Sequence, residues 1–147
     1  MLIFGVPLAE YLEARWQLDR TVSTGEVMTG VAMLSASSSS ELRYEENVSV
    51  TLTGGKKLEG FRSYIYQVNE DGFDICFDES PQRLFQHIEL EPISNGFEGS
   101  CSHLCGGDIY NSKIEILNDK RMRVTHQVKG PKKNYTSISI LEKSQIT

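Results

Sequence analysis

Residues 42–52 read Leu-Arg-Tyr-Glu-Glu-Asn-Val-Ser-Val-Thr-Leu, and this stretch decides the fold class. Leu, Tyr and Val recur at alternate positions with mostly polar residues between them, which is the period of a β-strand with one buried face. The pair Gly54-Gly55 follows and is typical of a tight turn. Glu46 lies on the buried face, so a cation is expected beside it, because an unpaired buried carboxylate is costly.

The same pattern continues on both sides of this stretch. Turn residues divide the chain into about ten expected strands. Their ranges are 15–23, 26–36, 42–52, 58–68, 73–78, 83–91, 97–105, 108–117, 121–129 and 135–143. One segment has helical character, with Pro7 in its first turn, and a short helix is expected over about 7–15.

No helix is available after residue 16 for the crossovers that parallel strands require, so the sheet must be antiparallel. Closure of the sheet removes its exposed edges. The sequence therefore predicts an all-β fold, a single antiparallel up-and-down β-barrel of about 8–10 strands. The N-terminal helix is expected to plug or flank one end.

The composition of the chain limits the functions it can have. Its 147 residues suit one domain over residues 1–147, with the barrel spanning about 15–144. The net charge of −5 argues against binding to nucleic acid. The sequence contains no run of about 18 apolar residues, so no membrane span is expected. The odd number of cysteines, three, argues against a disulfide framework and favours reduced thiols in the cytoplasm.

Alternation places a set of polar side chains on the inward faces of the strands. A cavity that mixes apolar walls with a few polar groups is typical of a small-molecule site. Arg62 is expected either to pair with Glu46 on the adjacent strand or to bind an acidic group of a ligand. Lys133, in the turn 130–134, is expected at the barrel mouth, where it would attract anions. The predicted ligand-binding residues are Tyr44, Glu46, Arg62, Tyr64, His103, Cys105, Tyr110 and Lys133.

Two kinds of chemistry are compatible with this interior. Glu46, Arg62 and Tyr64 are the catalytic candidates, with Glu46 as a general acid if burial raises its pKa. Either His103 or His126 could supply an axial ligand to haem. However, no metal-binding spacing accompanies these histidines, so we expect no metal and no other cofactor.

Two motifs resemble those of a bacterial family of unknown function with a lipocalin-like, calycin-type barrel. The first is His-x-Cys-x-x-Asp-x-Tyr at 103–110, and the second is Gly-Pro-Lys-Lys-Asn-Tyr at 130–135. Trp16 with Arg20, Tyr44-x-Glu46 and Arg62-x-Tyr64 fit the same pattern. The resemblance implies the fold and no assigned activity. Lys143 stands where the last strand of that family usually ends in Arg, and it is expected to lie over the ring of Trp16.

Three functional hypotheses follow from these observations. The first is a cytoplasmic module that binds a small hydrophobic molecule, anionic or aromatic in character. The second is a cofactor-independent lyase or isomerase that uses the interior Tyr, Glu and Arg side chains. The third is a structural or interaction protein whose barrel is filled. The sequence leaves the oligomeric state open.

Overall fold

All ten strands predicted from the alternation pattern are present in the computed structural model, which describes residues 1–144. An additional short strand, β9 (Glu91–Ile93), pairs with the edge of β10. The ten predicted strands are β3 (Ala14–Val22), β4 (Val27–Ala36), β5 (Glu41–Thr51), β6 (Lys57–Val68), β7 (Gly72–Phe77), β8 (Arg83–Glu89), β10 (Gly96–Cys105), β11 (Asp108–Asn118), β12 (Arg121–Lys129) and β13 (Asn134–Lys143).

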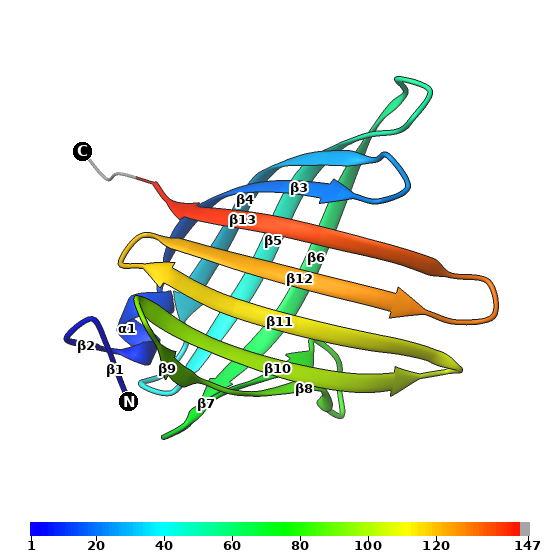
Figure 1. Cartoon of the computed structure of the whole chain (residues 1–147). Coiled ribbons are helices and arrows are strands. Elements are labelled where there is room, and N and C mark those ends of the chain that lie inside the picture. Colours follow the sequence, from blue (N-terminus) through cyan, green and yellow to red (C-terminus); the bar gives the residue numbers. More distant parts are fainter. Residues whose placement is uncertain (145–147) are drawn as a thin grey trace.

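Neighbours along the chain pair antiparallel throughout most of the main sheet. β13 returns to pair with β3, so the order of the eleven-stranded sheet is β8-β7-β6-β5-β4-β3-β13-β12-β11-β10-β9. At its two ends, β8 approaches β10 without a backbone ladder among the described residues. The sheet therefore curves into a nearly closed barrel (Figure 1).

Gly99 allows the close approach along this seam. A Cβ atom at this position of β10 would lie 2.8 Å from Cγ2 of Ile88 and would also collide with the carbonyl oxygen of Glu89, both on the β8 side. Any larger residue would therefore push the two strands apart.

The helix α1 (Leu8–Leu12) is shorter than the predicted 7–15, because the chain has already become extended at Ala14, the first residue of β3. A small ribbon of β1 (Leu2–Ile3) and β2 (Val6–Pro7) precedes it. Both elements lie at the end of the barrel where β3 begins and β13 ends (Figure 1). Leu8, Tyr11 and Leu12 are buried, so the helix plugs this end as predicted.

Aromatic and cationic side chains fasten α1 to the barrel. The Trp16 indole Nε1 donates to the carbonyl oxygen of Leu12 (3.0 Å), and the Tyr11 hydroxyl donates to the carbonyl oxygen of Asn118 (2.8 Å). Lys143 Nζ lies 5.2 Å from the ring centroid of Trp16, which confirms the predicted cation–π contact. The same ammonium is closer to Tyr11, at 4.1 Å.

The predicted inward faces are confirmed. In β5, Leu42, Tyr44, Glu46 and Val48 are all buried, whereas the residues between them are exposed. The inward residues of β10, β11 and β12 are likewise less exposed than their outward neighbours over most of each strand. Along these four strands the barrel interior is thus lined by alternate residues.

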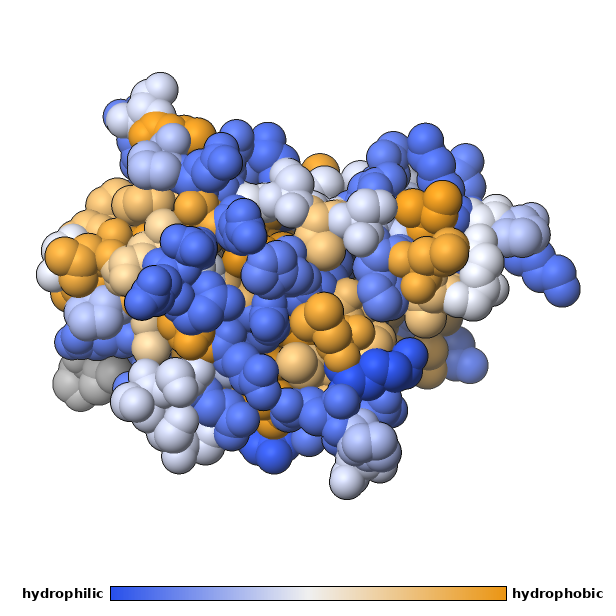
Figure 2. All heavy atoms as spheres, turned by 90° about the horizontal axis from the view of Figure 1, so that it is seen from below, coloured by the Kyte–Doolittle hydropathy of each residue, from blue (hydrophilic) through white to orange (hydrophobic). Residues whose placement is uncertain are grey.

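The outer surface is mixed in character. Figure 2 shows one face as mainly hydrophilic, with several separate hydrophobic patches. Among the described residues, the helix is far too short to cross a membrane.

A candidate ligand cavity with two polar clusters

A cavity of about 560 Å³ occupies the barrel interior. Leu12 of α1 lines one end, and Val22 at the end of β3 and the exposed Thr24 of the β3–β4 turn line the other. The cavity therefore extends from the helical plug to the end of the barrel that is ringed by hairpin turns (Figure 1).

Stacked aromatic rings form much of the wall. Tyr66 stacks on Tyr44 at a centroid distance of 5.4 Å and on Phe73 at 5.2 Å. Tyr64 stacks on Phe85 at 5.8 Å, and all five rings line the cavity. Such walls favour flat, apolar ligands, because rings stack on one another and bury large areas.

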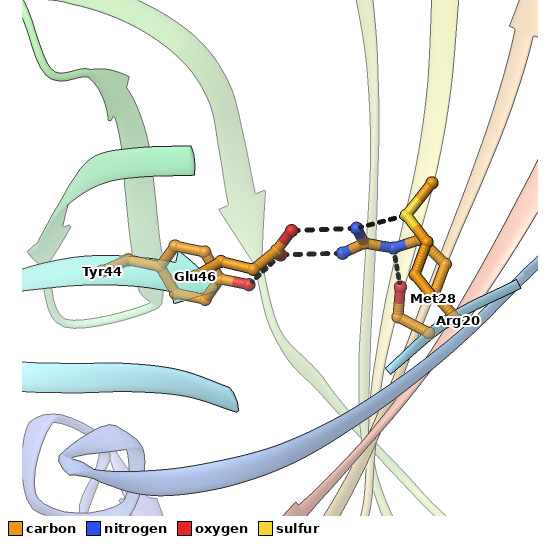
Figure 3. A network of polar contacts seen from close by, with 5 residues as sticks. Arg20, Met28, Tyr44 and Glu46 are labelled. Atoms are coloured by element: carbon orange, nitrogen blue, oxygen red, sulfur yellow. Dashed lines mark hydrogen bonds and ion pairs between the residues drawn. The ribbon is translucent and has the colours of Figure 1, made fainter. Parts of the chain in front are cut away.

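The first polar cluster, called here the arginine–glutamate cluster, consists of Arg20, Met28, Tyr44, Glu46 and Ser139, joined by hydrogen bonds. Figure 3 labels the first four. Arg20 binds the Glu46 carboxylate with two hydrogen bonds, from Nη1 (2.9 Å) and Nη2 (2.8 Å). The Tyr44 hydroxyl donates to Glu46 Oε1 at 2.7 Å, and Arg20 Nε donates to Ser139 Oγ at 2.7 Å. A bidentate pair with further hydrogen bonds is the arrangement that a buried ion pair needs.

The ion pair crosses one intervening strand. Arg20 lies on β3 opposite Met28 of β4, and Glu46 lies on β5 opposite Ala32 of β4. Gly30 is between these two β4 positions and presents no side chain toward the pair. A Cβ atom on Gly30 would collide with the backbone of β5, so glycine allows β4 and β5 to approach closely here.

The electrostatics of Glu46 are set by its partners. Burial alone would raise the pKa of its carboxyl, but the hydrogen bonds and charge of Arg20 outweigh burial, and the pKa lies below its usual value. Glu46 is therefore ionised at neutral pH. The general-acid hypothesis required a raised pKa, and this condition is not met.

The predicted partner of Glu46 is wrong. Arg62 lies directly opposite Glu46 in the β5–β6 register, as expected, but the ion pair forms with Arg20. Arg62 lines the cavity from an exposed part of β6 and has no ion pair with any described residue. The alternation that starts at Trp16 could have placed Arg20 on the inward face, because both residues lie at alternate positions of β3.

The second polar cluster, called here the glutamine–histidine cluster, consists of Gln86, Ser112 and His126. Gln86 Nε2 donates to Ser112 Oγ, and Ser112 Oγ lies 2.6 Å from Nδ1 of His126. Gln86 is 1% exposed, and its Oε1 has no partner among the described residues. Gln86 and His126 both line the cavity. Sequence reasoning noted His126 and missed Gln86, which belongs to a strand whose inward face was not identified.

His126 is uncharged in this environment. Burial is the main cause that lowers the pKa of its imidazole to about 4, and the nearby Arg20 and Arg62 lower this pKa further. The ring therefore acts at neutral pH as one hydrogen-bond donor and one acceptor.

The remaining predicted site residues divide into two groups. Tyr64, Cys105 and Tyr110 line the cavity with Arg62. His103 does not line it; its ring packs edge-on against Phe85 at 5.2 Å. Lys133 is also outside the lining and pairs with Asp108 at 3.3 Å.

Comparison with solved structures identifies barrels of similar fold at low sequence identity. An S-type phycobiliprotein lyase, CPES, from Guillardia theta aligns with a TM-score of 0.64 at 10% identity, covering 95% of this chain and 92% of that chain. A redesigned β-barrel, mFAP1, bound to DFHBI aligns with a TM-score of 0.50 at 12% identity, covering 92% of this chain and 97% of that one. A de novo designed fluorescence-activating β-barrel has the same TM-score and identity, with coverages of 95% and 99%.

No curated protein matches the sequence. A family model, by contrast, matches residues 12–143, which include every strand of the main sheet. The chain belongs to DUF6314, a family of unknown function.

Proposed function

We propose that the barrel binds a small hydrophobic molecule with an aromatic body and an anionic group, and that Arg62 binds the anionic group. The observation that carries this proposal is the cavity itself. Its volume of about 560 Å³ falls within the range of small-molecule pockets, and its lining is mainly apolar and aromatic.

The lining contains two arginines, and only one of them has a carboxylate partner among the described residues. The charge of Arg20 is neutralised by Glu46 in the bidentate pair. Arg62 has no such partner among the described residues, so its guanidinium is available to a ligand. A guanidinium recognises carboxylate, sulfonate or phenolate oxygens by charge-assisted hydrogen bonds.

The other two hypotheses receive less support. A filled structural barrel is not favoured by a cavity of this size. A lyase or isomerase that uses Glu46 as an acid is not favoured by a carboxylate locked by Arg20 and Tyr44. The barrels of similar fold add that this architecture accommodates a small molecule, because one of them is described as bound to DFHBI.

Two fluorescent probes that differ in charge test the proposal. The anionic dye 8-anilinonaphthalene-1-sulfonate carries a sulfonate that the neutral N-phenyl-1-naphthylamine lacks. Arg62→Gln should weaken binding of the anionic dye about tenfold, because it removes one charge-assisted hydrogen bond. Binding of the neutral dye should be unchanged. Native mass spectrometry of freshly purified protein should first establish whether a ligand is already bound.

Arg121→Gln is the matched control, because Arg121 is exposed and pairs with Glu142 on the barrel exterior. This variant should bind both dyes as the wild type does. The proposal fails if neither dye binds, and its charge preference fails if Arg62→Gln weakens both dyes equally.

A further inference from the structure

The glutamine–histidine cluster has, at each of its two ends, a polar atom without a hydrogen-bond partner among the described residues. Gln86 Oε1 is buried and has no partner among the described residues. The Nε2 atom of His126 is likewise without a hydrogen bond to any described residue, and its ring lines the cavity. A buried polar atom without a partner costs free energy, so a chain that retains one has a reason to do so.

Proton placement within the cluster determines what the open ends offer. Gln86 donates to Ser112 Oγ, and Ser112 must then donate to Nδ1 of His126, because its hydroxyl is buried and needs an acceptor. The imidazole proton then sits on Nε2. Gln86 Oε1 is left as a free acceptor and His126 Nε2–H as a free donor.

Rotation of the Gln86 amide by half a turn reverses every hydrogen bond in the cluster. His126 Nδ1–H then donates to Ser112, Ser112 donates to Gln86 Oε1, and the free ends exchange roles. One donor and one acceptor remain open in both arrangements. The cluster is therefore complementary to an uncharged group that itself has one donor and one acceptor.

We infer that the glutamine–histidine cluster recognises a secondary amide or lactam group of the ligand, through its N–H and its C=O. This inference rests on the proposed function and adds to it the chemistry of the neutral polar group. The flat rings of Tyr66, Tyr64 and Phe85 line the same cavity and suit a planar ring system fused to such a lactam. Neutral recognition is also consistent with an uncharged His126.

A purely structural role is the competing explanation. Gln86 lies on β8 and Ser112 on β11, and no ladder joins β8 to β10 among the described residues. The hydrogen bond from Gln86 to Ser112 thus ties the two sides of the seam together. A tie of this kind affects stability, but it does not discriminate between ligands that differ by one donor.

The test compares 2-quinolinone, a planar lactam, with N-methyl-2-quinolinone, which lacks the N–H. Their affinities are measured by displacement of N-phenyl-1-naphthylamine. The wild type should bind the lactam about tenfold more tightly, because the methylated analogue leaves one end of the cluster unpaired. Gln86→Leu and His126→Phe should each bring the ratio close to one. Gln127→Leu, on the exposed face of β12, should preserve it.

Equal affinity of the wild type for both quinolinones, with the neutral dye still bound, overturns the inference and leaves the cluster as a structural tie. Failure of the wild type to bind either dye refutes the proposed function, and the inference with it; if only the anionic dye binds, its displacement serves as the measurement. The wild-type comparison requires no substitution, so a variant that does not fold leaves the test intact.

Discussion

The arginine–glutamate cluster and the glutamine–histidine cluster lie on the wall of one cavity, yet they differ in how fully their polar atoms are paired. Arg20 and Glu46 bind each other twice, and Ser139 and Tyr44 take up further bonding positions. Gln86 and His126 each leave one group without a partner among the described residues. The first cluster is charged and the second is neutral at pH 7.

The cost of burial explains the difference. A buried charge without a partner is far more costly than a buried amide or imidazole without one. The charged cluster must therefore be complete before any ligand arrives. The neutral cluster tolerates an open end, which a ligand can fill. We infer that the arginine–glutamate cluster stabilises the barrel and that the glutamine–histidine cluster forms hydrogen bonds with the ligand.

Glu46→Leu should have the largest effect, because it leaves the buried Arg20 guanidinium without its carboxylate. We expect the free energy of unfolding to fall by about 3–5 kcal/mol, measured by urea denaturation. The double variant Arg20→Met/Glu46→Leu should recover much of this loss, since an apolar pair replaces the ions. A loss below about 1 kcal/mol in the single variant would contradict a structural role for the pair.

The pH dependence of stability should depend on His126. Its pKa is about 4 in the folded protein and about 6.5 when unfolded, so between these values the unfolded chain binds more protons. Stability is therefore lost as the pH falls through this window. The wild type should lose about 3 kcal/mol more than His126→Phe between pH 7 and pH 4, measured by urea denaturation at each pH. Parallel curves for the two proteins would show that the imidazole is not held neutral.

A pair of tyrosine variants gives the smallest effect and the closest comparison. Tyr44→Phe removes the hydrogen bond to the Glu46 carboxylate and should lower the free energy of unfolding by about 2 kcal/mol. Tyr64→Phe should change it by less than about 0.5 kcal/mol, because the Tyr64 hydroxyl has no hydrogen-bond partner among the described residues. Thermal melts of both variants provide the measurement, and equal losses would refute the distinction between a paired and a free hydroxyl.

Much of the barrel could be predicted from residue alternation. The period of two in residues 42–52 placed Tyr44 and Glu46 inside, and the strand register placed Arg62 opposite Glu46, as observed. The cation–π contact of Lys143 was also predictable from its place at the end of the last strand. The additional β9 was missed because Pro92 and the turn residues after it obscured a three-residue edge strand.

The partner of Glu46 was not predictable in the same way. Adjacent strands suggest Arg62, whereas the observed partner Arg20 lies two strands away and reaches across β4. Gly30, the β4 residue between the two positions, has no side chain that would block this reach. The hydrogen bond from Gln86 to Ser112 requires that β8 approach β10. These strands are not paired by a backbone ladder, so their approach could not be predicted from strand pairing.

The sequence alone determined the strands, the inward faces of several of them and the presence of a buried carboxylate that needed a cation, because these follow from a local period of two and the cost of burying charge. The tertiary structure decided which arginine neutralises that carboxylate and which has no ion pair among the described residues. It also decided which polar atoms have no partner within residues 1–144. Side chains from distant strands meet only when the sheet has curved into a barrel, and curvature is a property of the whole sheet.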